Sequence, residues 1–501
     1  IGRPAVIGRA KPTAIAQGLG ELYINPYADP GREGERVTRT VARVLDGGVM
    51  TNPLGIGVVL DNPSPTGARM VVDAINSRFP RQPGDDDDAA RGRGTKGNYQ
   101  LVQISVPDRY VDAPGDFINL IRFMQVDYFF AQQYANRYVN ALKTEFWLAQ
   151  DLAWALEALG RPALPFVQPL YDSSEPVTQF YALRVGARLG DERTAVYLTD
   201  IAADESSEFR LEAIELMRDL NRPNVDMVLR ELAGDDELRV RIAAYDVLVW
   251  RAEQVRISQA LAAGSSGLRL TPEQVRTIRR EASITMPPGM LQGIQRLAIG
   301  MTPSTRKPKF HVDIVPFGEP LIYVTQHGVP RIVLFGEHIE LADEFLIHAW
   351  DGRLMFRRDG PTDGVHVYYE LAGENGLPGP TVARDFMVKP DVIELLQFLA
   401  GKQQRRDPRP GLDLTYSETV GAVAAMLDGG GIEAAFATET DRLRAKLLAA
   451  AAVTRAPDRP DTDQPGLDDD FLGAGEAVTP TQSDSMVVPI RRSGGGGAGS
   501  H

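Results

Sequence analysis

Histidine is the residue type in this chain best suited to metal or acid–base chemistry, and its distribution is uneven. Five of the six histidines fall in one stretch. They are His311, His327, His338, His348 and His366. A zinc site needs three or four converging ligands. Hydrophobic alternation places His311 and His366 within ordinary strands and His327 in a turn, and the chain has no cysteine. We therefore expect no metal site.

Glycine-rich and acidic segments give no stronger signal. Gly92, Gly94 and Gly97 spell G-x-G-x-x-G, but they precede a predicted strand instead of opening a helix, which is the wrong context for dinucleotide binding. The run Gly429–Gly431 follows a predicted helix, so we interpret it as a helix stop and not as a phosphate cradle. The acidic run Asp85–Asp88 lacks the spaced ligands of a calcium loop, and we expect a solvated hairpin-type loop.

No catalytic constellation emerges from the remaining residues. There is no G-x-S-x-G elbow and no phosphate-binding G-x-x-x-x-G-K motif. The acidic pair Asp343 and Glu344 is of a kind common on protein surfaces. We therefore predict that the protein is not an enzyme and uses no cofactor, and we name no catalytic or cofactor-binding residue.

Composition sets further bounds. A soluble chain of 501 residues is expected to hold about two to four domains. The net charge of −13 argues against a nucleic-acid partner, which needs a concentrated basic face. No run approaches the roughly 18 apolar residues of a membrane span. Because the sequence begins Ile1-Gly2-Arg3 and not with Met, we expect a fragment or mature form, for which a missing signal peptide has no meaning.

Residues 56–127 show a β-α-β-α pattern. An apolar run at 56–61 has strand length, and Ala68, Val71 and Ile75 then recur at helical spacing. Residues 99–106 alternate like a half-buried strand, and an apolar helical stripe follows at 117–124. Two helices on one face of a small sheet leave its other face or edge free, so we expect this module to need a neighbour, for which copies of itself would serve.

The ordered motifs of residues 10–127 resemble the bacterial flagellar P-ring protein family. The segments that carry the resemblance are Ala-Ile-Ala-Gln-Gly at 14–18, Arg-Val-Leu-Asp-Gly-Gly-Val at 43–49, Val-Val-Leu-Asp-Asn-Pro at 58–63, Asp-Ala-Ile-Asn at 73–76, Val-Gln-Ile-Ser-Val-Pro at 102–107 and Phe-Ile-Asn-Leu-Ile at 117–121. The resemblance implies a P-ring-like module at 1–127. It also implies a homo-oligomeric ring in the periplasm, in the flagellar basal body, with the rod, the L-ring proteins and the peptidoglycan layer as partners.

A repeat follows the P-ring-like module. Segments 179–204 and 210–235 align at an offset of 31 residues, as from Ala182 to Ala213, and Ala244 continues the series. The pattern of each unit predicts two short amphipathic helices. Residues 131–262 therefore resemble about 3.5 short HEAT repeats. Such repeats bury their apolar stripes only when they are stacked. This helical segment departs from the P-ring family, which has a β-rich segment at the corresponding place.

The rest of the chain completes a multidomain α+β prediction. We expect a helical linker at 263–308 and a small antiparallel β-domain at 309–388. C-terminal helices should follow at 389–454, and a tail at 455–501, rich in Pro, Asp, Gly and Ser, should be disordered.

Two functions fit these predictions. The first is a structural subunit of the periplasmic P-ring, a bushing around the rod. The second is a cell-envelope scaffold or adaptor whose HEAT-like repeats bind a partner protein that the sequence does not identify. A third candidate function, which the sequence supports less, is that of an enzyme whose site lies in the β-domain.

Overall fold

The computed structural model of this chain combines a stack of helices with several small β-sheets. It describes residues 16–23, 42–45, 47–50, 56–82, 85, 87–92, 100–110, 113–127, 130–265, 270–284, 291, 293–301, 308–350, 352–370, 383–401 and 410–439. The end of the segment predicted to form C-terminal helices, 440–454, and the tail at 455–501 lie outside the described residues. Among the described residues, no helix combines the length and the apolar character that a membrane span requires.

The predicted β-α-β-α module is present, with one strand added. Its elements are β5 (Ile56–Val59), α1 (Pro65–Arg78), β6 (Ala90–Gly92), β7 (Leu101–Ile104) and α2 (Pro114–Arg122). The three strands form an antiparallel sheet in the order β5-β7-β6. Ser64 caps α1 by accepting a hydrogen bond from the Gly67 N–H, and Pro65 follows at the first helical position, where its missing N–H costs nothing.

The module packs against the helical stack of its own chain. Trp154 and Ala158 from the stack share a hydrophobic core with Phe117 and Leu120 of α2. Arg78, in the last turn of α1, donates hydrogen bonds to the carbonyl oxygens of residues 157 and 158, at 2.8 and 3.0 Å. The neighbour that the module needs is thus supplied within the chain, and a second copy is not needed to bury its helices.

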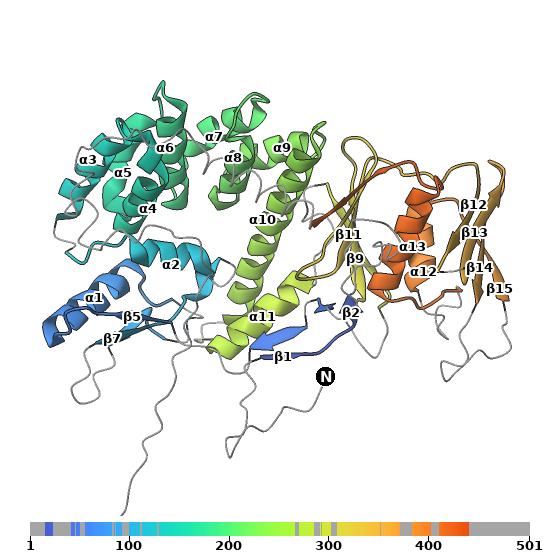
Figure 1. The fold of residues 1–501 in the computed structure, drawn as a ribbon, viewed down its shortest axis with the longest axis horizontal. Helices are drawn as coiled ribbons and strands as arrows, with labels where there is room; N and C mark the ends of the chain where they lie inside the picture. Colours follow the sequence, from blue (N-terminus) through green and yellow to red (C-terminus); the bar gives the residue numbers. More distant parts are fainter. Residues whose placement is uncertain are drawn as a thin grey trace, which may run out of the picture.

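The stack consists of successive helices packed side by side (Figure 1). They are α3 (Ala131–Leu142), α4 (Ala149–Leu159), α5 (Leu164–Val167), α6 (Pro176–Arg188), α7 (Thr194–Ala203), α8 (Arg210–Leu216) and α9 (Pro223–Leu232). The 31-residue alignment holds in the packing, because Ala182, Ala213 and Ala244 are all 0% exposed. Alanine at these positions lets neighbouring helices approach closely.

Helix α10 (Leu238–Ser265) continues the stack but is 28 residues long. It therefore extends beyond the half-repeat that the sequence alignment suggests. It packs on α8 and α9 at one end and on α11 (Pro272–Ile284) at the other. Thr271 caps α11 reciprocally, since its N–H donates to the Gln274 side chain and its hydroxyl accepts from the Gln274 N–H.

A five-stranded sheet packs against α10. Its order is β16-β10-β11-β9-β8. The strands are β8 (Gln295–Ile299), β9 (Phe310–Val315), β10 (Leu321–Val324), β11 (Arg331–Phe335) and β16 (Ala435–Thr438). The expectation of a purely antiparallel domain is wrong here, because β9 pairs with β11, and β10 with β16, in parallel. Strands β9 to β11 are buried almost throughout and are covered on both faces, which is the usual setting of parallel strands.

A second sheet is antiparallel, as expected. It comprises β12 (Glu344–Ala349), β13 (Leu354–Asp359), β14 (Val365–Glu370) and β15 (Ala383–Val388), joined in chain order. Helices α12 (Val392–Ala400) and α13 (Tyr416–Asp428) lie between the two sheets (Figure 1). Residues of both sheets and both helices form one core. The structure therefore differs from the expected division at 388/389, and β8 falls within the segment expected to be a helical linker.

The N-terminal strands lie apart from the β-α-β-α module. Strand β1 (Ala16–Gly18) pairs with β4 (Gly48–Met50), and β2 (Leu22–Tyr23) pairs with β3 (Arg43–Val44). The Tyr23 ring lies 5.7 Å from the Tyr416 ring of α13, and Tyr23 belongs to the core of the two sheets. The motifs expected to form one unit at 1–127 are therefore divided between two parts of the molecule.

Replacement of Ala213 by aspartate tests the packing of the stack. Because Ala213 is fully buried in the main core, Ala213→Asp places an unpaired charge at a close helix contact. We expect the free energy of unfolding to fall by about 2–5 kcal/mol. Chemical denaturation followed by circular dichroism measures the change. Val196→Asp, at a side chain that is 59% exposed on α7, is the control. Equal free energies of unfolding for Ala213→Asp and the wild-type chain would contradict the packing.

Candidate functional site: two buried joints and a groove

The structure does not bring the five histidines together. His311 is buried on β9, His348 lies on β12 and His366 on β14, while His338 is exposed after β11. His327 pairs with Glu439 at 3.2 Å and His366 with Asp385 at 3.2 Å. Within the described part of the chain, no three His, Asp or Glu side chains form a group that could hold a metal ion.

The acidic run is only partly the solvated loop that the sequence suggests. Asp85 is 8% exposed, and its carboxylate accepts hydrogen bonds from the N–H groups of Gln82 and Asp108, each at 2.7 Å. It therefore ties the end of the α1 segment to the turn after β7. Asp87 pairs with Arg91 at the surface. Gly92 ends β6, whereas Gly94 and Gly97 lie outside the described residues. The run Gly429–Gly431 forms the turn after α13, as expected.

The most strongly buried charges lie where α10 meets the five-stranded sheet. Asp313, in the middle of β9, is 0% exposed. Arg296 of β8 donates to both of its carboxylate oxygens, Nε to Oδ1 and Nη2 to Oδ2, each at 2.7 Å. The hydroxyl of Tyr245, from α10, donates to Oδ2 at 2.6 Å. Glu253, also on α10, lies 3.5 Å from Arg296 and 3.8 Å from Arg331. We call these five residues the α10–sheet joint.

The electrostatic environment of the α10–sheet joint favours the ionised carboxylate and guanidinium over their neutral forms. Burial alone would raise the pKa of Asp313, but the hydrogen bonds and charge of Arg296, with the charge of Arg331, lower it below its ordinary value. Burial raises the pKa of Tyr245, and the neighbouring Asp313 raises it further. Asp313 therefore stays a carboxylate and Tyr245 stays a phenol. Because both side chains are 0% exposed, a substrate does not reach them, and the group acts as a structural connection.

A second set of charges joins the β-α-β-α module to the stack. Arg188 of α6 lies 3.2 Å from Asp116 of α2 and 3.5 Å from Asp219 after α8. Nearby, the carboxylate of Glu157, which is 3% exposed, accepts a hydrogen bond from Arg184 at 2.9 Å. Burial raises the pKa of Glu157, while Arg184 and Arg188 oppose that rise. A cleft of about 240 Å³ is lined by Arg188, Asp116, Asp219 and Glu157. Because these charges lie close together at the contact between the module and the stack, we interpret the cleft as a second joint.

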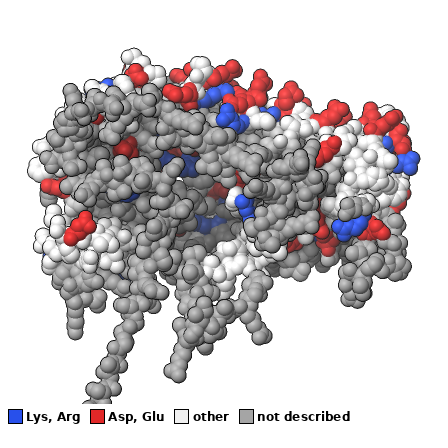
Figure 2. All heavy atoms as spheres, viewed as in Figure 1, with Lys and Arg blue, Asp and Glu red and all other residues white. Residues whose placement is uncertain are grey.

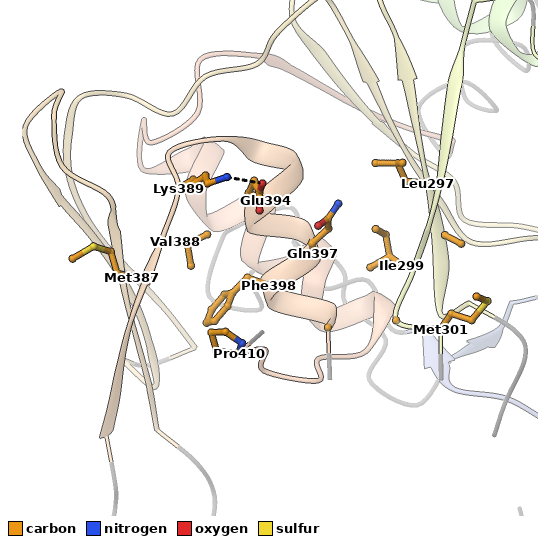
Figure 3. Close-up of a pocket in the computed structure, with 13 residues that line it drawn as sticks. Leu297, Ile299, Met301, Met387, Val388, Lys389, Glu394, Gln397, Phe398 and Pro410 are labelled. Carbon is orange, nitrogen blue, oxygen red and sulfur yellow. Dashed lines mark hydrogen bonds and ion pairs between the residues drawn. The ribbon is translucent and has the colours of Figure 1, made fainter. Parts of the chain in front are cut away.

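A groove of about 530 Å³ lies at the other end of the molecule, between the edges of the two sheets. Strands β8 and β15 form its sides, and α12 lies between them (Figure 3). Leu297 and Ile299 point from β8 towards α12, and Gln397 points back from α12. Lys389 donates to Glu394 at 3.4 Å on the rim. No described strand pairs with the outer edge of β8 or of β15.

The Asp-Ala-Ile-Asn segment at 73–76, part of the resemblance, has a clear structural role. Ala74 and Ile75 are buried in α1. The side-chain amide of Asn76 donates to the Ala90 carbonyl at 2.9 Å and accepts from the Ala90 N–H at 2.8 Å, so it fastens α1 to β6. In contrast, Ile56 and Val59 on the edge strand β5 are 38% and 60% exposed.

Charge on the visible surface agrees with the net negative charge. Figure 2 shows acidic side chains gathered along the edge formed by the turns of the helical stack, with Lys and Arg only in small scattered groups on that face. The described residues of this face therefore form no continuous basic stripe that could contact a phosphate backbone.

Comparisons with known proteins add little. No protein-family model matches the chain, and no curated protein matches it. One solved structure that matches is the complex of CpcE and CpcF of phycocyanin lyase from Nostoc sp. PCC7120. The sequences are 21% identical, and the match covers 29% of this chain and 98% of the chain in that structure. The TM-score of 0.20 is too low for that likeness to support a fold or a function.

Replacement of Asp313 tests the α10–sheet joint. Asp313→Asn keeps the shape but leaves Arg296, which is 6% exposed, without its closest counter-charge. We expect the free energy of unfolding at pH 7 to fall by about 3–5 kcal/mol, as for other broken buried ion pairs. Urea denaturation at several pH values measures it. Lys389→Ala, which breaks an exposed ion pair, should change the value by less than about 1 kcal/mol.

The pH dependence gives an internal check on Asp313→Asn. Because folding lowers the pKa of Asp313, its stabilisation is fully present above its unfolded pKa and is lost as the pH falls through the lower folded pKa. The gap in stability between the wild-type chain and the variant should therefore be constant above about pH 5 and shrink below about pH 4. A gap that widens in acid would contradict the assignment.

Proposed function

We propose that this protein is a structural subunit of the periplasmic P-ring of the bacterial flagellar basal body. Its role there is that of a bushing around the rod at the peptidoglycan layer, and it catalyses no reaction. The observation that carries the proposal is the ordered set of motifs at 10–127, which includes the Asp-Ala-Ile-Asn helix and the two strands on either side of it. Its partners are further copies of itself, the rod and L-ring proteins, and peptidoglycan.

The arrangement of charged groups supports a structural role. The most buried ionisable side chains, such as Asp313 and Glu157, are paired with arginine and lie at contacts between parts of the chain. A catalytic group must touch its substrate, and perturbed pKa values often mark such groups, but here they coincide with joints. The joints instead hold the module, the stack and the sheets together, as a structural subunit requires.

The edge strand β5 supplies a surface for self-association. It pairs only with β7 among the described strands, and its exposed residues Ile56 and Val59 are apolar. Exposed apolar edge strands readily pair with strands of other chains. In a closed ring, each subunit uses one face to contact a different face of the next subunit, and repetition by rotation closes the ring. We assign β5 to one of these two faces.

One observation favours the second candidate, an envelope scaffold or adaptor. We infer that 131–262 is a HEAT-like repeat, and its 31-residue offset relates Val196 on α7 to Met227 on α9. These side chains are 59% and 53% exposed, so successive repeats present an apolar side chain at the same position. Such a stripe is a docking surface for a partner protein and is compatible with ring assembly through β5.

Two matched lysine substitutions test the assembly role. The intact chain should form larger species as its concentration rises, and Val59→Lys should return it to monomer, because a charge on an edge strand prevents pairing. Val196→Lys, at a side chain of nearly equal exposure, should leave assembly unchanged. Sedimentation velocity measures the species present. A wild-type chain that stays monomeric at high concentration, or two variants that behave alike, would count against assembly through β5.

A further inference from the structure

The groove between β8 and β15 has the chemistry of a site for an extended peptide. Both bordering strands are edge strands within the described part of the chain, so each presents unpaired backbone N–H and C=O groups. An extended segment that adds to such an edge satisfies those groups by strand addition. The outer edges of the two sheets thus border a single site.

Side chains of the groove select an apolar segment. Leu297 and Ile299 of β8 point to its interior, and Phe398 of α12 contributes an aromatic ring (Figure 3). Met301, just after β8, lines the groove and is 55% exposed. Methionine is flexible and polarisable, and it is common where a protein binds varied apolar segments. The rim carries one positive and one negative side chain, Lys389 and Glu394.

The chain itself contains a matching segment beyond the last described residue. From residue 455 onwards the sequence is rich in Pro, Asp, Gly and Ser, and its longest apolar run is Met-Val-Val-Pro-Ile at 486–490. Asp484 precedes this run, and Arg491 and Arg492 follow it. The run is therefore flanked by charges of both signs, as the groove is at its rim. Proline lacks an N–H and is tolerated on the outer side of an edge strand, so an added strand requires a register in which the backbone nitrogen of Pro489 faces away from β8.

We propose that residues 486–490 dock in the groove of their own molecule as a strand added to the edge of β8. Met486 follows Glu439 by 47 residues in the sequence. A flexible chain of that length has a root-mean-square end-to-end distance of roughly 40 Å. Strand β16, which precedes it, lies four strands from β8, or roughly 19 Å. The tail therefore reaches the groove, and its effective concentration there is on the order of millimolar, which favours docking within one molecule over docking between copies.

This docking covers an exposed sheet edge at the opposite end of the molecule from β5. Covering edges is a general means by which proteins avoid unwanted strand pairing. The proposal concerns the groove and the tail alone, and it holds whether or not the chain is a ring subunit.

Competition by a synthetic peptide tests the proposal on the intact chain. A fluorescent peptide covering residues 482–494 is added to the wild-type chain and to full-length Val488→Asp, whose own tail cannot dock. Fluorescence anisotropy should show that the peptide binds Val488→Asp at least tenfold more tightly than the wild-type chain, because the wild-type groove is occupied. Equal affinities, or no binding to Val488→Asp, would overturn the proposal.

Two methionine substitutions in the Val488→Asp chain locate the site. Met301→Glu, in the groove, should weaken peptide binding at least tenfold. Met70→Glu, which makes the same change at a side chain of similar exposure on α1, should have no effect. Weakening by Met70→Glu alone would place the peptide on the β-α-β-α module and refute docking in the groove.

Hydrogen exchange and sedimentation complete the test. The N–H groups of 295–301 should exchange more slowly in the wild-type chain than in Val488→Asp, because the added strand protects the edge of β8. The wild-type chain and Val488→Asp should show the same oligomeric state in sedimentation velocity, because docking takes place within one molecule. An oligomer that Val488→Asp dissociates would place the segment in a neighbouring copy and overturn the proposal.

Discussion

The buried contact between Asp313, Arg296 and Tyr245 is the interaction on which the rest of the arrangement depends. A carboxylate in the middle of a central strand is stable there only because a guanidinium and a phenol satisfy both of its oxygens. The phenol comes from α10, which also carries the end of the helical stack. The group thus fixes the stack to the sheet, and both Asp313 and Tyr245 are fully buried there.

From this joint the other contacts extend along the molecule. Trp154 and Arg78 hold the β-α-β-α module on the stack, and Tyr23 holds the N-terminal strands on α13. Figure 1 shows the result, with the module and the two-sheet part at opposite ends and α10 between them. The edge of β5 and the groove beside β8 therefore lie at opposite ends of the molecule.

Sequence reasoning predicts local elements and misses long-range ones. Periodicity gives α1, α2, the repeat and most strands, because each has a one-sided apolar pattern. The parallel pairing of β9 with β11 and the shared core around α12 and α13 depend on contacts between distant segments, which no local pattern encodes. Asp313 within Phe-His-Val-Asp-Ile-Val was the available signal for the α10–sheet joint, since a charge inside an apolar strand needs a partner. Its partner Tyr245 lies 68 residues away.

Imaging of flagellar basal bodies tests the central claim most directly. Electron cryotomography would compare cells that carry this protein, tagged with a dense label, with cells from which its coding sequence has been deleted. A structural ring subunit predicts label at the level of the peptidoglycan around the rod, loss of that density on deletion, and impaired swimming while export of early rod parts continues. A deletion strain that swims normally, with basal bodies lacking no density, would contradict the account.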